Sequence, residues 1–116
     1  MWGIQPWDND RAADWFANLL DKSALPDRVR ATLEVAETAE PDEENAPLLR
    51  AAAYCLVQFG HVYVWPVKHL TADLARAIKA LQIVEEDDEY CYSEEIRAAV
   101  ANERQTLQLR LDSLPC

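Results

Sequence analysis

The spacing of hydrophobic residues predicts a series of amphipathic helices. In the first, which runs to about Lys22, apolar residues recur every three or four positions and form one buried stripe. These residues are Ala12, Trp15, Phe16, Leu19 and Leu20. Asp8, Asn9 or Asp10 is suited to cap this helix, because a short oxygen-bearing side chain accepts hydrogen bonds from the free amides of the first turn.

A second helix is expected to begin at Pro26, whose fixed φ angle suits a first helical turn, and to end before Pro41. Asp27 then lies near the positive end of the helix dipole, where a negative charge is stabilising. The predicted inner face of this helix carries Val29, Leu33 and Ala36.

The segment 46–60 is apolar almost all round. Only Arg50, Tyr54 and Gln58 interrupt a run of small and large hydrophobic residues. A helix without a polar face is surrounded by neighbours, so we expect this helix at the centre of the fold. Gly60 is suited to end it as the glycine that follows many helices.

Residues 61–70 show no clear period. Four residues with strand propensity precede Pro66, but they are too few for a convincing strand, so we predict a partly buried loop. A fourth helix is expected after it with Thr71 as its cap, and a fifth with Ser93 as its cap. The inner faces of these two helices are predicted to be Leu74, Ala77, Ile78, Leu81 and Val84, and Ile96, Val100, Leu107, Leu111 and Leu114.

Composition agrees with an all-helical chain. Half of the 116 residues are hydrophobic, and only two, Gly3 and Gly60, are glycine. Proteins with many tight turns between strands depend on glycine far more. We therefore predict a single all-α domain over residues 1–116, with about five helices in a roughly antiparallel bundle and helix 46–60 at its centre.

Charge is distributed unevenly along the chain, whose net charge is −10. No Lys or Arg occurs from 31 to 49 or from 80 to 96, and each of these stretches holds an acidic cluster. If the helices alternate in direction, both clusters and the start of the first helix lie at one end of the bundle. The predicted protein-binding residues at this acidic end are Asp42, Glu43, Glu44, Glu86, Asp87, Asp88, Glu89, Trp2 and Trp7.

The acidic end has two interpretations. Clustered negative charge attracts a basic protein partner, or it only keeps solvated loops polar. Trp2 and Trp7 likewise either anchor a partner or clamp the N-terminal segment over the bundle. The negative charge argues against binding to nucleic acids and to anionic membranes, because both are polyanions. The pattern determines no oligomeric state.

The lack of a recognisable targeting signal and the spacing of the cysteines together indicate the compartment. No stretch is long and apolar enough for a membrane span, and residues 1–6 lack the basic start and apolar run of a signal peptide. Cys55, Cys91 and Cys116 are odd in number and without paired spacing, which is ordinary in a reducing compartment. We therefore predict a cytoplasmic protein.

The sequence contains no familiar metal or catalytic motif. His61 and His69 are eight residues apart, and neither CxxC nor HExxH occurs. The Asp8–Asp10 segment is favoured as a helix cap over a cation site, because it lacks a third ligand and a glycine. Cys91 follows a run of acids, which disfavours a thiolate nucleophile. We predict no metal, no cofactor and no enzymatic activity.

The opening of the chain resembles that of a bacterial family of small all-α proteins of unknown function. Members open with Trp-Gly-x-x-x-Phe-Asp-Asn-Asp, followed by a further aromatic residue. The corresponding residues here are Trp2, Gly3, Trp7, Asp8, Asn9, Asp10 and Trp15. Trp7 replaces the phenylalanine and keeps an aromatic ring, whereas the segment after Ser93 departs from the family pattern. The resemblance implies a bacterial origin and an all-α fold, and it brings no catalytic residues.

Size, acidity and charge clustering predict a small cytoplasmic protein-interaction module. Its most concrete form is an immunity-type protein that masks a basic partner such as a toxin domain. One alternative is a small-ligand-binding or regulatory domain with a pocket between helix 46–60 and the loop at 62–65. Another is a hydrolase in which two carboxylates converge in a cleft and one of them has a raised pKa.

Overall fold

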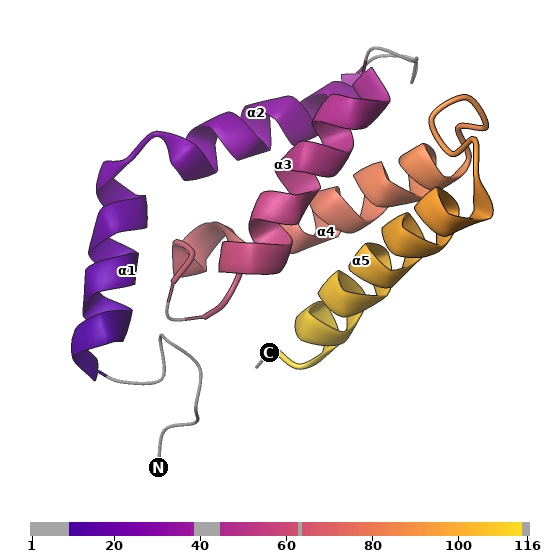
Figure 1. The fold of residues 1–116 in the computed structure, drawn as a ribbon. Helices are drawn as coiled ribbons and strands as arrows, with labels where there is room; N and C mark the ends of the chain where they lie inside the picture. Colours follow the sequence, from indigo (N-terminus) through magenta and orange to yellow (C-terminus); the bar gives the residue numbers. More distant parts are fainter. Residues whose placement is uncertain (1–9, 39–44, 63, 115–116) are drawn as a thin grey trace.

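The computed structural model describes residues 10–38, 45–62 and 64–114, which form five helices and, within these ranges, no strand. Along the chain the helices are α1 (Asp10–Lys22), α2 (Leu25–Thr38), α3 (Asn45–Phe59), α4 (Val67–Glu85) and α5 (Glu94–Asp112) (Figure 1). The predicted all-α class and the number of helices are confirmed. None of the described helices is both long enough and apolar enough to cross a membrane.

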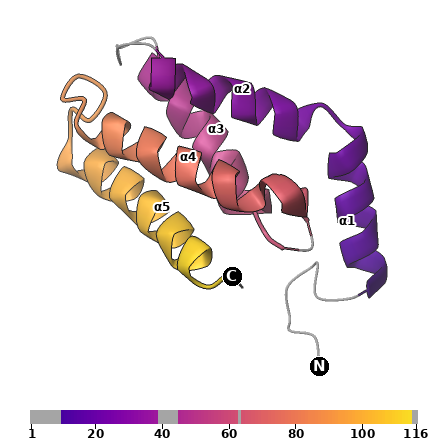
Figure 2. The same ribbon diagram turned by 180° about the vertical axis from the view of Figure 1, so that it is seen from behind.

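Helices α2 to α5 form the body of the molecule and reverse direction one after another (Figures 1 and 2). As predicted for a central helix, α3 packs against α2, α4 and α5. The centre is shared with α4, which packs against α2, α3 and α5 and buries residues along its whole length. The outer side of α3 leaves Leu48, Tyr54 and Phe59 exposed, so its apolar surface is not fully covered.

The hydrophobic periods of the second, fourth and fifth helices place the core as expected. Val29 and Leu33 of α2 are buried, as are all five residues predicted for the inner face of α4. In α5, Val100 and Leu107 are buried, and Ile96, Leu111 and Leu114 pack against the core as partly buried residues. A single apolar cluster thus joins α2, α3, α4 and α5.

The caps predicted for the fourth and fifth helices have different outcomes. Ser93 caps α5, because its hydroxyl oxygen accepts a hydrogen bond from the amide of Ile96 at 3.2 Å. Thr71 does not cap α4, which begins earlier, at Val67, directly after Pro66. The fixed φ angle of Pro66, −54° here, prepares the chain for the helix without a side-chain cap.

Helix α1 lies at the edge of the fold and corrects the stripe predicted for it. Among the described helices it packs only against α2, and it stands at a steep angle to α2 (Figures 1 and 2). Ala13 and Leu20 are its buried residues, whereas Trp15 is 61% exposed and Leu19 is 48% exposed. The stripe is only partly buried because α1 has neighbours on one side alone.

The connection from α3 to α4 is a partly buried loop in which Val64 and Trp65 lie in the core, but it is shorter than the predicted 61–70, because residues 67–70 belong to α4. Gly60 does follow α3, but its φ angle is not positive. A glycine is needed at this position because there is no room for a side chain: a Cβ atom would lie 2.5 Å from the carbonyl oxygen of Leu56. Arg110 of α5 binds the end of α3 by donating to that same oxygen at 2.7 Å, which complements the helix dipole.

Candidate interaction site

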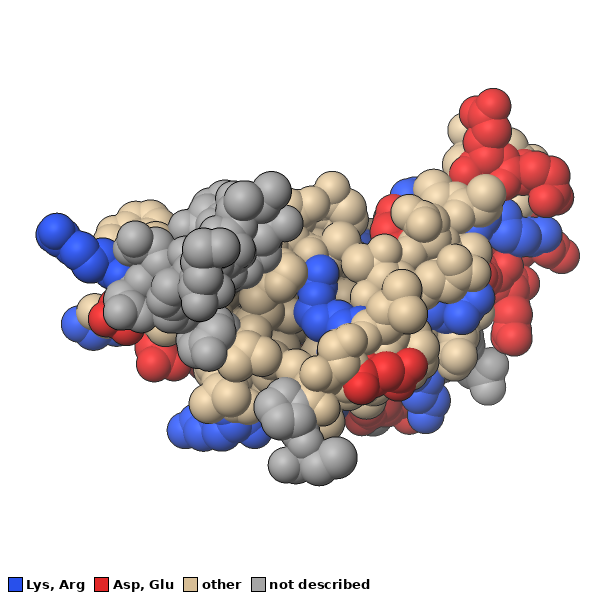
Figure 3. Space-filling view, turned by 90° about the horizontal axis from the view of Figure 1, so that it is seen from below, with Lys and Arg blue, Asp and Glu red and all other residues tan. Residues whose placement is uncertain are grey.

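The α4–α5 connection, residues 86–93, forms one end of the molecule, and the end of α2 and the start of α3 lie at the same end (Figures 1 and 2). Acidic side chains gather there (Figure 3). The exposed ones on the connection and the first turn of α5 are Glu86, Asp88, Glu89, Glu94 and Glu95, and Glu34 and Glu37 are exposed near the end of α2. The start of α1 lies at the opposite end, which corrects the prediction that it joins the acidic end.

Part of the predicted binding set lies outside the described residues. This part comprises Trp2, Trp7, Asp42, Glu43 and Glu44, together with Gly3, Asp8 and Asn9 of the opening motif. Of the motif residues that the structure describes, Asp10 begins α1 and Trp15 is exposed on it. The acidic residues that can be placed are therefore those of the α4–α5 connection and the first turn of α5.

The connection is held in one shape by its own polar groups. One carboxylate oxygen of Asp87 accepts hydrogen bonds from the amides of Glu89 at 3.0 Å and Tyr90 at 3.1 Å. Cys91 is buried, and its thiol donates to the carbonyl oxygen of Val84 at 3.3 Å. Asp87 thus stabilises the conformation of the connection, although the sequence analysis predicted that it binds a partner.

The other acids of this end differ in their engagement. Asp88 forms an exposed ion pair with Arg97 at 2.8 Å. Glu86 and Glu89 are exposed and form no ion pair within the described part of the chain. Of the four described acids in the predicted binding set, Glu86 and Glu89 are therefore the two whose charge is open to a partner.

Beside the acids, α3 and α5 are joined by a polar cluster around Arg50. Its guanidinium binds both carboxylate oxygens of Glu103, with N···O distances of 3.0 and 2.7 Å, and donates to the hydroxyl of Tyr90 at 3.2 Å. The same guanidinium lies 6.0 Å from the centre of the Tyr90 ring. The hydrogen bonds to Glu103, above all, raise the pKa of Arg50, so this side chain remains a paired cation.

Two neighbouring hollows share Arg50 and Tyr90. The first, which we call the Tyr92 hollow, has a volume of about 430 Å³ and is otherwise lined by Glu89, Tyr92 and Ile96. The second, of about 350 Å³, is otherwise lined by Pro47, Ala51, Tyr54 and Glu103. Tyr92 is 80% exposed, so an aromatic ring stands open to solvent next to the acidic residues.

Sequence reasoning placed aromatic residues beside the acids but chose the tryptophans of the opening segment. In the described structure this place is occupied by Tyr90 and Tyr92, on either side of the buried Cys91. The alternation of a buried residue between two tyrosines, directly after the acidic run, is the signal that could have identified them. Arg50 could not be assigned, because its role depends on the contact between α3 and α5.

A second polar cluster lies inside the molecule and was not predicted. The carboxylate of Asp73 in α4 is fully buried and accepts four hydrogen bonds. Arg30 of α2 donates two at 2.9 and 2.8 Å, the indole of Trp65 one at 2.9 Å, and Arg76 one at 3.1 Å. Asp73 shares the buried face of α4 with Ala77, which lies four residues further along the helix. This spacing is the feature of the sequence that could have indicated that Asp73 is buried.

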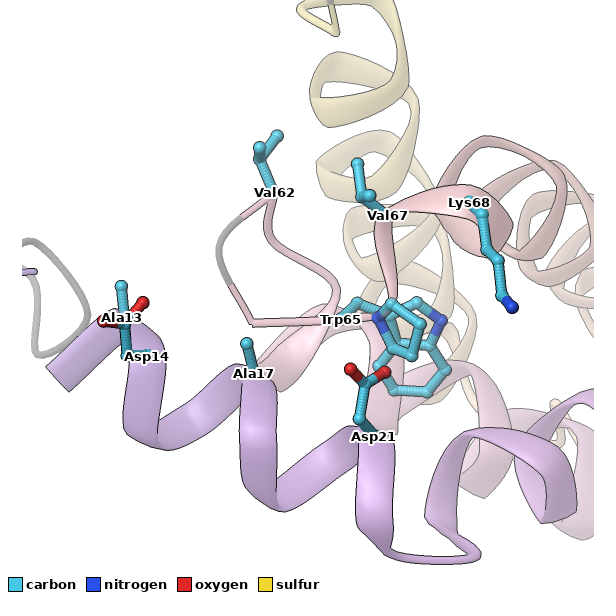
Figure 4. Close-up of a pocket in the computed structure, with 9 residues that line it drawn as sticks. Ala13, Asp14, Ala17, Asp21, Val62, Trp65, Val67 and Lys68 are labelled. Carbon is cyan, nitrogen blue, oxygen red and sulfur yellow. The ribbon is translucent and has the colours of Figure 1, made fainter. Parts of the chain in front are cut away.

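A third feature is a cleft between α1 and the segment 62–68, with a volume of about 440 Å³. Asp14, Ala17 and Asp21 project from α1 on the side that faces Trp65 and Val67 (Figure 4). Lys68 lies on the opposite wall. The pocket that the ligand-binding alternative expected against the third helix therefore lies against α1 instead, as far as the described residues show.

Within the described residues, no group of three or more His, Cys, Asp or Glu side chains could hold a metal ion. Burial raises the pKa of the Cys55 thiol, which disfavours the reactive thiolate. Asp73 is the one buried carboxylate of the described chain, and its oxygens are occupied by donors. Asp14 and Asp21 share a cleft but are exposed, so no observation favours the carboxylate hydrolase.

The model of a family described as Domain of unknown function (DUF4259) matches residues 1–107. Neither the curated proteins nor the solved structures contain a significant match to the chain.

Proposed function

Because the chain belongs to the DUF4259 family, whose description names no activity, we propose its function from its own surface. The protein is an interaction module whose acidic end binds a partner protein with a basic surface. The observation that carries this proposal is the exposed Tyr92 ring beside the open carboxylate of Glu89, with the open carboxylate of Glu86 on the same connection. Aromatic residues are enriched at the centres of protein interfaces, and charge of one sign selects and steers the partner.

The shape of the acidic end supports this role. The hydrogen bonds of Asp87 and Ser93 hold the connection and the first turn of α5 in place before any partner arrives. A surface that is already ordered loses less conformational freedom on binding, so more of the contact energy appears as affinity. Loops that only provide solubility have no need of such order.

The proposed partner is a cationic protein, and an immunity-type role, in which the chain masks a toxin domain, is the most concrete form of this hypothesis. A domain that acts on nucleic acid carries Lys and Arg to neutralise phosphates, and an acidic cover competes for that surface. We place the protein in the cytoplasm of a bacterium. The free thiols of Cys55 and Cys91 are compatible with a reducing compartment.

The test is capture of partners from the source organism with two matched double variants. Glu86→Gln/Glu95→Gln removes two charges at the acidic end, and Asp14→Asn/Asp21→Asn removes two at the other end. We expect a basic protein that the wild type and the second variant retain and the first variant loses. Its association rate should fall steeply with salt, because screening weakens steering. Equal retention by both variants, or recovery of small molecules without a protein, would refute the proposal.

The cleft at α1 supports a second candidate function, binding of a small ligand. Trp65 forms an aromatic wall there, and Asp21 and Lys68 supply opposite charges. Ala17→Trp would fill the cleft. If the protein carries a small molecule, native mass spectrometry of material from the source organism should show the added mass in the wild type and not in this variant.

A further inference from the structure

The Tyr92 hollow has a lining that recognises one kind of side chain. We propose that it receives a lysine or arginine side chain of the basic partner. In this arrangement Glu89 binds the charged head, Tyr92 covers it with its ring, and Ile96 contacts the aliphatic stem. This inference rests on the proposed function, because it names the contact through which the acidic end selects its partner.

The chemistry of the lining favours a long basic side chain. Glu89 is exposed and supplies a carboxylate to the lining, while Ile96 is partly buried and packs against the core. Lysine and arginine combine a cationic head with an apolar stem, so they match a lining that joins an exposed carboxylate to a partly buried apolar side chain. A purely apolar side chain would leave the carboxylate without a partner.

Arg50, the one cation among the described residues that line the hollow, does not convert it into an anion site. Both carboxylate oxygens of Glu103 bind Arg50, which cancels most of its charge locally. Four further exposed acids lie on the same connection and on the first turn of α5: Glu86, Asp88, Glu94 and Glu95. One of them, Asp88, is paired with Arg97. An incoming anion would meet this negative potential, whereas a cation is attracted by it.

The two tyrosines of the lining differ in one respect that matters for a ligand. Tyr90 already has the guanidinium of Arg50 at 6.0 Å from its ring centre. Tyr92 is 80% exposed and has neither a ring contact nor a hydrogen bond among the described residues. The ring of Tyr92 can therefore make, with an external cation, the same kind of cation–π contact that Tyr90 makes with Arg50.

The experiment measures binding of labelled hexa-arginine, hexa-lysine and hexa-glutamate peptides to the full chain at low salt. Glu89→Gln is compared with Glu86→Gln, which removes the same charge from the same connection but does not line the hollow. Tyr92→Leu is compared with Tyr92→Phe, which keeps the ring. The side chains of Glu89 and Tyr92 are exposed, and a thermal melt of each variant confirms that the variant is folded.

We expect both basic peptides to bind and hexa-glutamate not to bind. Glu89→Gln should weaken binding more than Glu86→Gln does. Tyr92→Leu should weaken it roughly two- to fivefold, the range of an exposed cation–π contact, while Tyr92→Phe leaves it unchanged. The double variant Glu89→Gln/Tyr92→Leu should lose less than the product of the single losses, because both residues hold one side chain.

Two failures can be told apart. If Glu86→Gln and Glu89→Gln weaken binding equally and Tyr92→Leu has no effect, the hollow is not the contact, although the acidic end still binds basic partners. If none of the variants changes binding and salt has no effect either, the proposed function itself is refuted. Preferential binding of hexa-glutamate would also overturn the inference.

Discussion

Two regions of this molecule use carboxylates in opposite ways. Asp73 is fully buried between α2, α4 and the loop that carries Trp65, and Arg30, Arg76 and Trp65 all donate to it. At the acidic end, by contrast, carboxylates such as Glu89 are exposed to water and pair with no cation among the described residues. The same functional group is thus a structural connector in one place and an open charge in the other.

The difference shows what burial costs and what exposure preserves. A carboxylate taken out of water loses its hydration, and only well-placed donors offset this loss. At Asp73 those donors come from three segments of the chain, so the carboxylate holds these segments together. An exposed carboxylate keeps its hydration and its charge, and it remains available to a partner. Four substitutions test this contrast, in order of decreasing expected effect.

Asp73→Asn should have the largest effect on stability. It keeps the shape of the side chain but removes the charge that Arg30 and Arg76 face in a buried setting. Breaking a buried ion pair costs about 3–5 kcal/mol, and we expect the lower end because both arginines are partly exposed. Urea unfolding followed by circular dichroism measures the loss. A loss no greater than that of Asp88→Asn would show that the buried cluster contributes no special stability.

Trp65→Phe should have the second largest effect. It removes the indole donor to Asp73, a hydrogen bond of 2.9 Å, and leaves a smaller ring in the core. A hydrogen bond to a charged group contributes roughly 1.5–3 kcal/mol, so the free energy of unfolding should fall by about that amount. The same urea experiment applies, and the double variant with Asp73→Asn should show strong non-additivity. Additive losses would mean that the two side chains act independently.

Asp88→Asn should have a small effect. It breaks the ion pair with Arg97, which lies at the surface, where water and salt screen the attraction. We expect the midpoint of urea unfolding to shift by less than for Trp65→Phe, and the shift to disappear at high salt. A shift that persists in high salt would indicate that this pair also supports the shape of the connection.

Glu86→Gln should have the smallest effect, and of opposite sign. Glu86 lies at the C-terminal cap of α4, where the helix dipole disfavours a negative charge. Removing this charge should stabilise the fold by about 0.3 kcal/mol, the lower end for an exposed position. A small rise in melting temperature at low salt checks the prediction. A fall would mean that the Glu86 side chain makes a stabilising contact that neutralisation removes.

The candidate site could be predicted from sequence only in part. The acidic run and its place at a helix connection follow from the sequence, since no cation occurs between 80 and 96. Arg50, Tyr54 and Glu103 enter the site because α3 lies against α5, and nothing near them in sequence indicates that contact. Asp73 was missed because a hydrophobic period shows which side of a helix is buried, not which polar residue on that side has found donors.

By itself, the sequence determined the local features of this protein. Helix periods, the Ser93 cap and the position of the acidic clusters depend on neighbours within one or two turns, so they can be read from a single segment. Tertiary structure alone decided which faces are covered: Trp15 is exposed because α1 lies at the edge, and Asp73 is buried because Arg30 reaches it from α2. Burial depends on distant segments, and no local period encodes their arrangement.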